Sequence, residues 1–462
     1  MKLYSKIIFL SLTLSILISC SASDNNATSN PSNYEQYGES FTAMPKSEDA
    51  IIYQVNIRAF SQQGTLNGVK AKLNDIKDLG ANVIYLMPIY PVGTLNSAGG
   101  LGSPYAVKDY KAVNPDFGTL EDLRSLVTEA HNMGMAVVLD WVANHTAWDN
   151  AWITEHPDWY QHDPESGAII IPPGTNYNDV AQLNFDNNDM RAAMIDAMSY
   201  WVYNANIDGF RCDYADAVPQ SFWTDAIATV RAIKKDQSLL MLAEGSRVHH
   251  FYEGFDYTFG FGYFDALKKV YSENKPATTL QDANASEYAN NYNNAYKIVR
   301  YTSNHDVNLS DGTPIELFHG TKGSVAAFVV AAYMQSVPMI YNAQEIGYAS
   351  RLGVFTRTPI DWNMADATVL AEYKKIIAFR KSSNAIKTGT YKGFSAANVS
   401  AFTMETATEK VMVISNMTNT TANYIMPASL TTTAWKDAFT DVAMPATNEI
   451  ILMPYQYLVL KN

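Results

Sequence analysis

The stretch that decides the fold runs from Gly209-Phe-Arg-Cys-Asp213 to Leu242-Ala-Glu244. Each half is a short apolar run typical of a buried β-strand, and each ends in a carboxylate. Residues 222–234 between them have helical spacing, so the pattern is strand, helix, strand. Burying a carboxylate is costly, so two of them at the ends of consecutive strands indicate a functional site.

Two further segments have the same character, namely Asp140-Trp-Val-Ala-Asn-His145 and Ser303-Asn-His-Asp306. Short apolar runs and helical stretches alternate along this part of the chain, which predicts repeated β/α units. We expect a (β/α)8 barrel with its chemistry at the C-terminal strand ends, where the four segments follow the third, fourth, fifth and seventh strands. The eight predicted strands are 51–55, 83–87, 136–139, 209–212, 239–243, 255–259, 298–302 and 338–341. The predicted helices are 69–79, 120–133, 190–205, 222–234 and 325–335.

Together the four segments resemble, in the same order, the signature regions of the α-amylase family of glycoside hydrolases. The runs Gly80-Ala-Asn-Val-Ile-Tyr-Leu-Met-Pro88 and Val337-Pro-Met-Ile-Tyr-Asn-Ala-Gln-Glu-Ile-Gly347 resemble its second-strand and eighth-strand regions. The resemblance extends from about residue 51 to the C-terminus. It implies a retaining enzyme that hydrolyses α-glucosidic bonds, mainly α-1,4, in starch and maltooligosaccharides.

Glycoside hydrolysis uses two carboxyl groups, held about 5 Å apart in retaining enzymes. The resemblance implies that Asp213 is the nucleophile, that Glu244 is the general acid and then the base, and that Asp306 stabilises the transition state. Arg211, two residues before Asp213 on one strand, faces the same side. We expect its charge to lower the pKa of Asp213, and the apolar neighbours of Glu244 to raise that of the acid.

Each residue alone has a plainer interpretation. An aspartate at a strand end is commonly a turn or cap residue, and Arg211 with Asp213 is also compatible with a structural ion pair. His305 alone is compatible with a hydrogen-bonded loop histidine. The combination in family order favours catalysis.

The resemblance also implies substrate-binding and metal-binding residues. Tyr105, in Pro104-Tyr-Ala-Val-Lys-Asp-Tyr110, stands where the family stacks a ring on the sugar, and His145 and His305 hydrogen-bond that sugar. Asn144 and Asp179 match the oxygen ligands of a structural calcium ion. Tyr177 and three tryptophans of the same region are candidate walls for further sugars.

The domain organisation follows from changes in pattern along the chain. A long Trp-, Pro- and Asp-rich stretch matches the family's inserted B domain, and alternating apolar and Thr/Asn-rich runs near the C-terminus predict a β-sandwich. The predicted parts are a signal peptide (1–19), a flexible tether (20–47), the barrel (48–144 and 187–381), the B domain (145–186) and the C-terminal β-sandwich (382–462).

The N-terminal segment predicts export. Lys2 and Lys6 precede an apolar run that ends in Leu17-Ile-Ser-Cys20, which resembles a bacterial lipobox, so Cys20 is the expected lipidation site of a protein at the cell surface or in the periplasm. A simple secretory signal is the alternative. The membrane is then a partner only through the lipid anchor. The net charge of −13 argues against nucleic acid as a partner.

Some positions depart from the family pattern. Many α-amylases carry Lys-His at the third and fourth positions after the nucleophile, where this chain has Asp216 and Ala217. Gln182-Leu-Asn184 resembles a variable region that correlates loosely with specificity. A glucan transferase, or an enzyme resembling cyclomaltodextrinase, neopullulanase or oligo-1,6-glucosidase, therefore remains an alternative. A non-catalytic sugar-binding protein is a remote one, because all three carboxylates are present.

Overall fold

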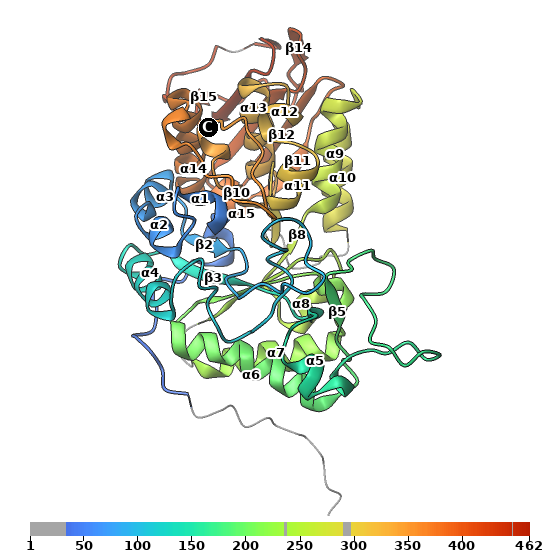
Figure 1. Ribbon diagram of the computed structural model, residues 1–462. Helices are drawn as coiled ribbons and strands as arrows, with labels where there is room; N and C mark the ends of the chain where they lie inside the picture. The colour runs from blue at the N-terminus through green and yellow to red at the C-terminus, as the bar shows by residue number, and fades with distance from the viewer. Residues whose placement is uncertain (1–33, 235–237, 290–296, 446) are drawn as a thin grey trace, which may run out of the picture.

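The computed structural model describes residues 34–234, 238–289, 297–445 and 447–462 (Figure 1). The predicted signal peptide and Cys20 lie outside these residues, and lipidation and export stay predictions. Within the described part of the chain, no helix has the length and apolar character needed to cross a membrane.

Eight parallel strands close into a barrel, as the sequence predicted. Their order around the barrel is β1, β10, β9, β8, β7, β6, β3, β2. Barrel strands that follow one another in the chain are therefore neighbours in the barrel, and β1 pairs with β10 to close it. The numbering jumps from β3 to β6 because β4 and β5 form a separate pair. All eight are buried along their whole length, which explains why their residues are mostly apolar. The barrel strands are β1 (Ile52–Val55), β2 (Val83–Leu86), β3 (Ala136–Trp141), β6 (Gly209–Cys212), β7 (Leu240–Ala243), β8 (Tyr257–Phe259), β9 (Ile298–Arg300) and β10 (Val337–Tyr341).

Gly209 allows β6 to pack against β7. Its φ is +144°, and a Cβ atom at this position would lie 1.8 Å from the backbone oxygen of Leu240. No side chain fits there. Gly209 thereby places Arg211 beside Asp140 of β3 and Leu242 of β7 in the barrel register.

Helices surround the barrel, and capping side chains fix the start of several of them. Thr119 and Asp122 form a capping box at the start of α4, and Asn187 caps α6. The predicted helix 69–79 is two helices, because the chain breaks at Ala71 and Lys72. The longer helices are α3 (Leu73–Leu79), α4 (Leu120–Asn132), α6 (Asn188–Ala205), α7 (Gln220–Ile233), α9 (Phe261–Ser272), α10 (Thr278–Tyr288), α13 (Thr321–Tyr333) and α14 (Ala367–Ser382). The shorter ones are α1 (Ile57–Phe60), α2 (Leu66–Lys70), α5 (Trp152–Glu155), α8 (His250–Glu253), α11 (His305–Ser310), α12 (Pro314–Leu317) and α15 (Asn384–Thr388).

An insertion follows the third barrel strand. Strands β4 (His145–Ala147) and β5 (Val180–Gln182) pair in antiparallel fashion, with His145 opposite Gln182. The chain between them extends away from the barrel at the right of Figure 1. The two strands anchor the insertion beside the C-terminal strand ends, although the predicted domain boundaries stay predictions.

The C-terminal part forms a separate antiparallel sheet of order β11-β12-β13-β17-β15, with a two-stranded ribbon, β14 and β16. Side chains of β12 alternate between two cores: Ala401 packs with residues of the ribbon, whereas Phe402 belongs to the main core shared with the barrel and its helices. The sheet is therefore covered on both faces. Its strands are β11 (Thr390–Gly393), β12 (Val399–Glu405), β13 (Lys410–Asn416), β14 (Ala422–Ile425), β15 (Lys436–Asp437), β16 (Glu449–Leu452) and β17 (Tyr457–Lys461).

Candidate active site

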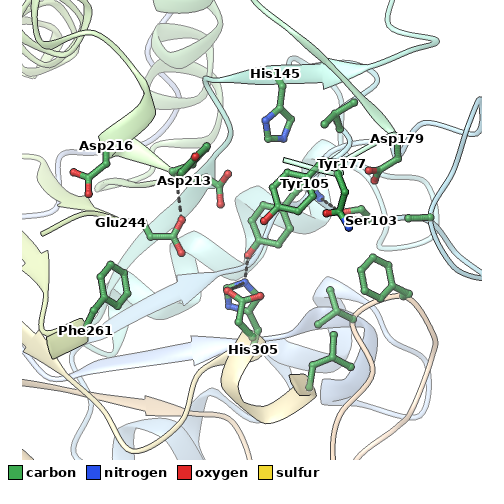
Figure 2. A pocket seen from close by; sticks show the side chains of 18 residues that line it. Ser103, Tyr105, His145, Tyr177, Asp179, Asp213, Asp216, Glu244, Phe261 and His305 are labelled. Atoms are coloured by element: carbon green, nitrogen blue, oxygen red, sulfur yellow. Dashed lines mark hydrogen bonds and ion pairs between the residues drawn. The ribbon is translucent and has the colours of Figure 1, made fainter. Parts of the chain in front are cut away.

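A cavity of about 580 Å³ opens at the C-terminal ends of the barrel strands (Figure 2). Side chains from the barrel, the insertion and the loop around residue 355 surround it. Its lining includes seven of the predicted site residues, namely Tyr105, His145, Asp179, Asp213, Glu244, His305 and Asp306. Of the aromatic residues proposed as walls from the insertion, Tyr177 lines the cavity, whereas Trp148, Trp152 and Trp159 do not.

Arg211 joins the carboxylates beneath this cavity. Its Nη1 donates to Asp140 Oδ1 at 2.7 Å and to Asp213 Oδ1 at 2.9 Å, and its Nη2 pairs with Glu244 Oε1. The Arg211 side chain is almost completely buried. Because one guanidinium contacts both groups, the carboxylates of Asp213 and Glu244 converge on one point of the cavity floor.

The backbone after Asp213 also fixes Glu244. Tyr214 has a left-handed conformation with φ of +45°, and its backbone N–H donates to Glu244 Oε2 at 2.8 Å. This contact is the one drawn beside Glu244 in Figure 2. A bulky residue with positive φ is uncommon, and such strain concentrates at functional sites. Glu244 is thus held on one oxygen by Arg211 and on the other by the backbone.

The electrostatics of Asp213 differ from the prediction. Burial raises the pKa of Asp213 well above its usual value, and the neighbouring carboxylates of Glu244 and Asp140 raise it further, while Arg211 lowers it. Arg211 therefore acts in the predicted direction, but its effect is outweighed. The prediction was wrong about the net pKa because burial and two neighbouring carboxylates together outweigh the single charge of Arg211.

Tyr105 and His305 form a hydrogen-bonded pair at the cavity wall. The Tyr105 hydroxyl lies 2.7 Å from His305 Nε2 and donates to Asp140 Oδ2 at 3.1 Å. Gln54 Nε2 lies 2.9 Å from His305 Nδ1, which fixes the other side of the imidazole. The two rings stack with centroids 5.3 Å apart. The pair is consequently rigid before any ligand arrives.

His145 and Asp306 both line the cavity, but His145 is buried whereas the side chain of Asp306 is exposed. Burial lowers the pKa of His145 to about 4, so its imidazole is neutral at pH 7. Asp306 lies at the start of α11, where Asn304 caps the helix. Its carboxylate is largely exposed and lies 3.3 Å from His305 Nε2. Asp306 therefore remains available to a ligand.

The two predicted calcium ligands do not form a calcium site in this arrangement. Gln182 Nε2 donates to Asn144 Oδ1, to the Asn144 carbonyl and to the Leu183 carbonyl at 3.0–3.2 Å. Three oxygens thus surround an amide nitrogen where a cation coordinated by them would lie. Asp179 faces the cavity instead. Calcium binding stays a prediction of the family resemblance alone, and the contacts of Gln182 argue against it.

Three residues with evident roles in the geometry received none from the sequence. Asp140 is completely buried and accepts hydrogen bonds from Tyr85, Tyr105 and Arg211. Its position inside an apolar strand is the signal that identifies it. Gln54 has no such signal, and Asp216, which lines the cavity, stands out in the sequence only because it departs from the family pattern.

The chain is similar to known proteins over most of its length. A family model described as the α-amylase catalytic domain matches residues 24–168 and 174–430. α-Amylase 2 of Dictyoglomus thermophilum is 25% identical over 420 residues, covering 83% of this chain and 72% of that protein. An α-1,4-glucan:maltose-1-phosphate maltosyltransferase of Rhodospirillum rubrum is 34% identical over 200 residues, covering 39% of this chain and 28% of that protein.

The fold is also similar to solved structures. The crystal structure of an α-amylase from Lactobacillus plantarum superposes with a TM-score of 0.80 at 27% identity, covering 90% of this chain and 99% of that one. Both the family model and this superposition agree with the barrel fold. The chain therefore belongs to the α-amylase family of glycoside hydrolases and related transferases.

Proposed function

We propose that this enzyme hydrolyses α-glucosidic bonds, mainly α-1,4, in starch and maltooligosaccharides with retention of configuration. The observation that supports this most directly is the convergence of Asp213 and Glu244 on Arg211 at the floor of the cavity. Retaining glycosidases need two carboxyl groups about 5 Å apart. Two carboxylates that contact one guanidinium are compatible with that spacing.

In the proposed first step, Asp213 attacks the anomeric carbon while Glu244 donates its proton to the leaving oxygen. The glycosidic C–O bond breaks, its electron pair goes to the leaving oxygen, and a covalent glycosyl-Asp213 ester forms. In the second step Glu244 takes a proton from water, and the resulting oxygen nucleophile displaces Asp213. Two inversions give net retention.

Other cavity residues are assigned to binding the sugar. Tyr105 offers a ring face held by His305, and apolar C–H surfaces of sugars pack on such faces. Asp306 is exposed and supplies a hydroxyl-binding carboxylate close to the positive charge that develops on the sugar. Neutral His145 both donates and accepts a hydrogen bond.

The test is hydrolysis of starch, maltotriose and pullulan by the purified enzyme, with the anomeric form of the first product followed by proton NMR. Starch and maltotriose should yield α-anomeric reducing sugars that later mutarotate. β-Anomeric product would contradict the double displacement. Absence of cleavage of all three substrates would contradict the proposed function.

A glucan transferase is the second candidate. The relative from Rhodospirillum rubrum, whose name states a maltosyltransferase, is 34% identical to part of this chain. A transferase passes the same glycosyl-Asp213 to a sugar hydroxyl in place of water. Incubation of maltotetraose with labelled glucose distinguishes the two, because transfer produces labelled longer sugars and hydrolysis does not.

A further inference from the structure

Asp216 lines the cavity on the side of Glu244, opposite Tyr177 and Asp179 (Figure 2). Its carboxylate lies close to the backbone that follows Glu244, and a Cβ atom on Gly245 would lie 2.6 Å from Asp216 Oδ1. The absence of a side chain at Gly245 is therefore what lets Asp216 approach. Asp216 is three residues after Asp213, so one loop carries both carboxylates into the cavity.

A buried histidine holds Asp216 in place. His250 Nε2 lies 2.7 Å from Asp216 Oδ1, and His250 Nδ1 lies 2.6 Å from Glu253 Oε2. The side chains of His250 and Glu253 are each about 1% exposed. The three residues form a chain of carboxylate, imidazole and carboxylate that runs from the core to the cavity wall.

The charge state of this chain follows from its donors and acceptors. A neutral imidazole has one N–H donor, whereas both nitrogens of His250 face carboxylates, so the doubly protonated ring satisfies both contacts. In agreement, the two hydrogen bonds raise the pKa of His250 against the opposing effect of its burial. Burial raises the pKa of Asp216, but His250 outweighs it and brings that pKa below the usual value. Asp216 is thus an oriented, ionised acceptor.

One oxygen of Asp216 remains accessible from the cavity. Oδ2 has a long backbone contact, 3.4 Å from Ser246 N, and Oδ1 also lies 3.4 Å from Arg247 Nε. The Asp216 side chain is 31% exposed, in contrast to the buried His250 and Glu253. A carboxylate that is rigid on one side and open on the other is suited to accept hydrogen bonds from sugar hydroxyls.

We propose that Asp216 binds hydroxyls of the sugar on the leaving-group side of the scissile bond, and that His250 and Glu253 are positioning residues for it. Asp216 is assigned to the leaving-group side because of its position next to Glu244. Glu244 protonates the leaving oxygen and therefore faces the leaving sugar. Asp216 adjoins the backbone directly after Glu244. This inference rests on the proposed hydrolase function.

The experiment compares two substrates for each variant. Maltotetraose places sugars on the leaving-group side, whereas α-maltosyl fluoride releases only fluoride and places none there. For Asp216→Asn, the ratio of kcat/KM for maltotetraose to kcat/KM for the fluoride should fall about tenfold, which is the effect of one hydrogen bond to a charged group. An unchanged ratio would overturn the inference. If the wild-type enzyme cleaves neither substrate, the proposed hydrolase function fails instead.

Variants of His250 separate positioning from general damage. His250→Phe removes both hydrogen bonds, and the same ratio should fall. His250→Gln retains an N–H donor for Asp216 and should recover part of that ratio. Equal ratios for the two variants would contradict a positioning role.

Asp225 on α7 offers a matched control. Asp225→Asn removes the same charge outside the cavity and should leave the ratio at the wild-type value. His249, His250 and Glu253 also lie close enough together to hold a metal ion. Stoichiometric zinc in the purified protein would overturn the account, because the metal would then hold Glu253 in place of a protonated His250.

Discussion

Arg211 and Asp213 face the same side of one strand, and Nη1 of Arg211 donates to Oδ1 of Asp213 over 2.9 Å. Asp140 accepts from that same nitrogen at 2.7 Å, and Glu244 pairs with the other terminal nitrogen. Three carboxylates therefore share one positive charge. The ionisation of Asp213 depends on all of them, which makes the site sensitive to each partner.

Replacing either proposed catalytic carboxyl should remove turnover while the fold persists. Asp213→Asn has no nucleophile, and Glu244→Gln has no proton to donate, so kcat on starch should fall by at least about 10³-fold. Glu244→Gln should retain more activity on α-maltosyl fluoride than on starch, since fluoride leaves without a proton. Steady-state kinetics with circular dichroism as the folding control test this. Equal losses on both substrates would argue against Glu244 as the acid.

Removing Asp140 should shift the pH dependence of activity. The pKa of Asp213 is raised by burial, by Glu244 and by Asp140, and attack requires the ionised form. Activity therefore falls as the pH falls through this raised pKa. Asp140→Asn removes one of the raising charges, so the acid limb of the kcat/KM profile should move to lower pH. A shift to higher pH would show that Asp140 acts mainly by orienting Arg211.

Glu345 should make the stability depend on pH. It lies just after β10, accepts from the Tyr53 hydroxyl at 2.6 Å, and burial raises its pKa to about 7. The folded state then binds a proton more tightly than the unfolded state does. This stabilisation is complete below the unfolded pKa and is lost as the pH rises through about 7.

Glu345→Gln should reduce this dependence. The free energy of unfolding of the wild type should decrease by a few kcal/mol, on the order of 3, between pH 5 and pH 8, and the variant should lose less. Urea denaturation at both pH values measures the difference. Parallel curves for the two proteins would show that Glu345 stays ionised in the folded state.

Gly209→Ala should prevent normal packing of β6 on β7. The added Cβ lies 1.8 Å from the backbone oxygen of Leu240, and a backbone atom cannot rotate away. We expect a loss of at least about 3 kcal/mol or an insoluble protein. Gly100→Ala is the control, because its Cβ would meet its nearest atom at 3.8 Å. Thermal unfolding of both variants checks this, and equal stabilities would contradict the steric argument.

Removal of calcium should leave the protein unaffected, since Gln182 Nε2 takes the three oxygens around Asn144. A site filled at 100 times its Kd would contribute about 2.7 kcal/mol, which chelation would remove. We expect the Tm with EDTA to equal the Tm with added calcium. A higher Tm with calcium would establish the site that the resemblance implies. Gln182→Ala should lower the Tm under both conditions.

The barrel was predictable because each strand carries its own signal. Residues 209–212 were predicted as a strand and form one with the same bounds, since a buried strand needs only a short apolar run between polar ends. The helix prediction for 69–79 missed the break at Ala71 and Lys72, where no glycine or proline marks it. A local sequence pattern reveals a helix break only where a helix-breaking residue such as glycine or proline is present, and none is present at this break.

The residues that gather around the cavity were largely predictable, whereas the contacts among them were less so. Asp213 and Glu244 were identified from their position after strands. The partners Asp140 and Gln54 lie 71 and 251 residues from the groups they contact, and no local pattern connects them. The net pKa of Asp213 was missed for the same reason, because burial and distant charges combine only in the folded protein.

The pairing of β4 with β5 fixes the two ends of the insertion next to the barrel. Its outer turn near Gly167 is open, because no atom lies within 4 Å of a Cβ placed on Gly167. Tyr177 and Asp179, just before β5, form the cavity rim. Lengthening or shortening this outer turn should therefore change the insertion without disturbing the barrel beneath. The turn near Gly167 is thus the place where the chain can accept extra residues while Tyr177, Asp179 and the barrel keep their positions.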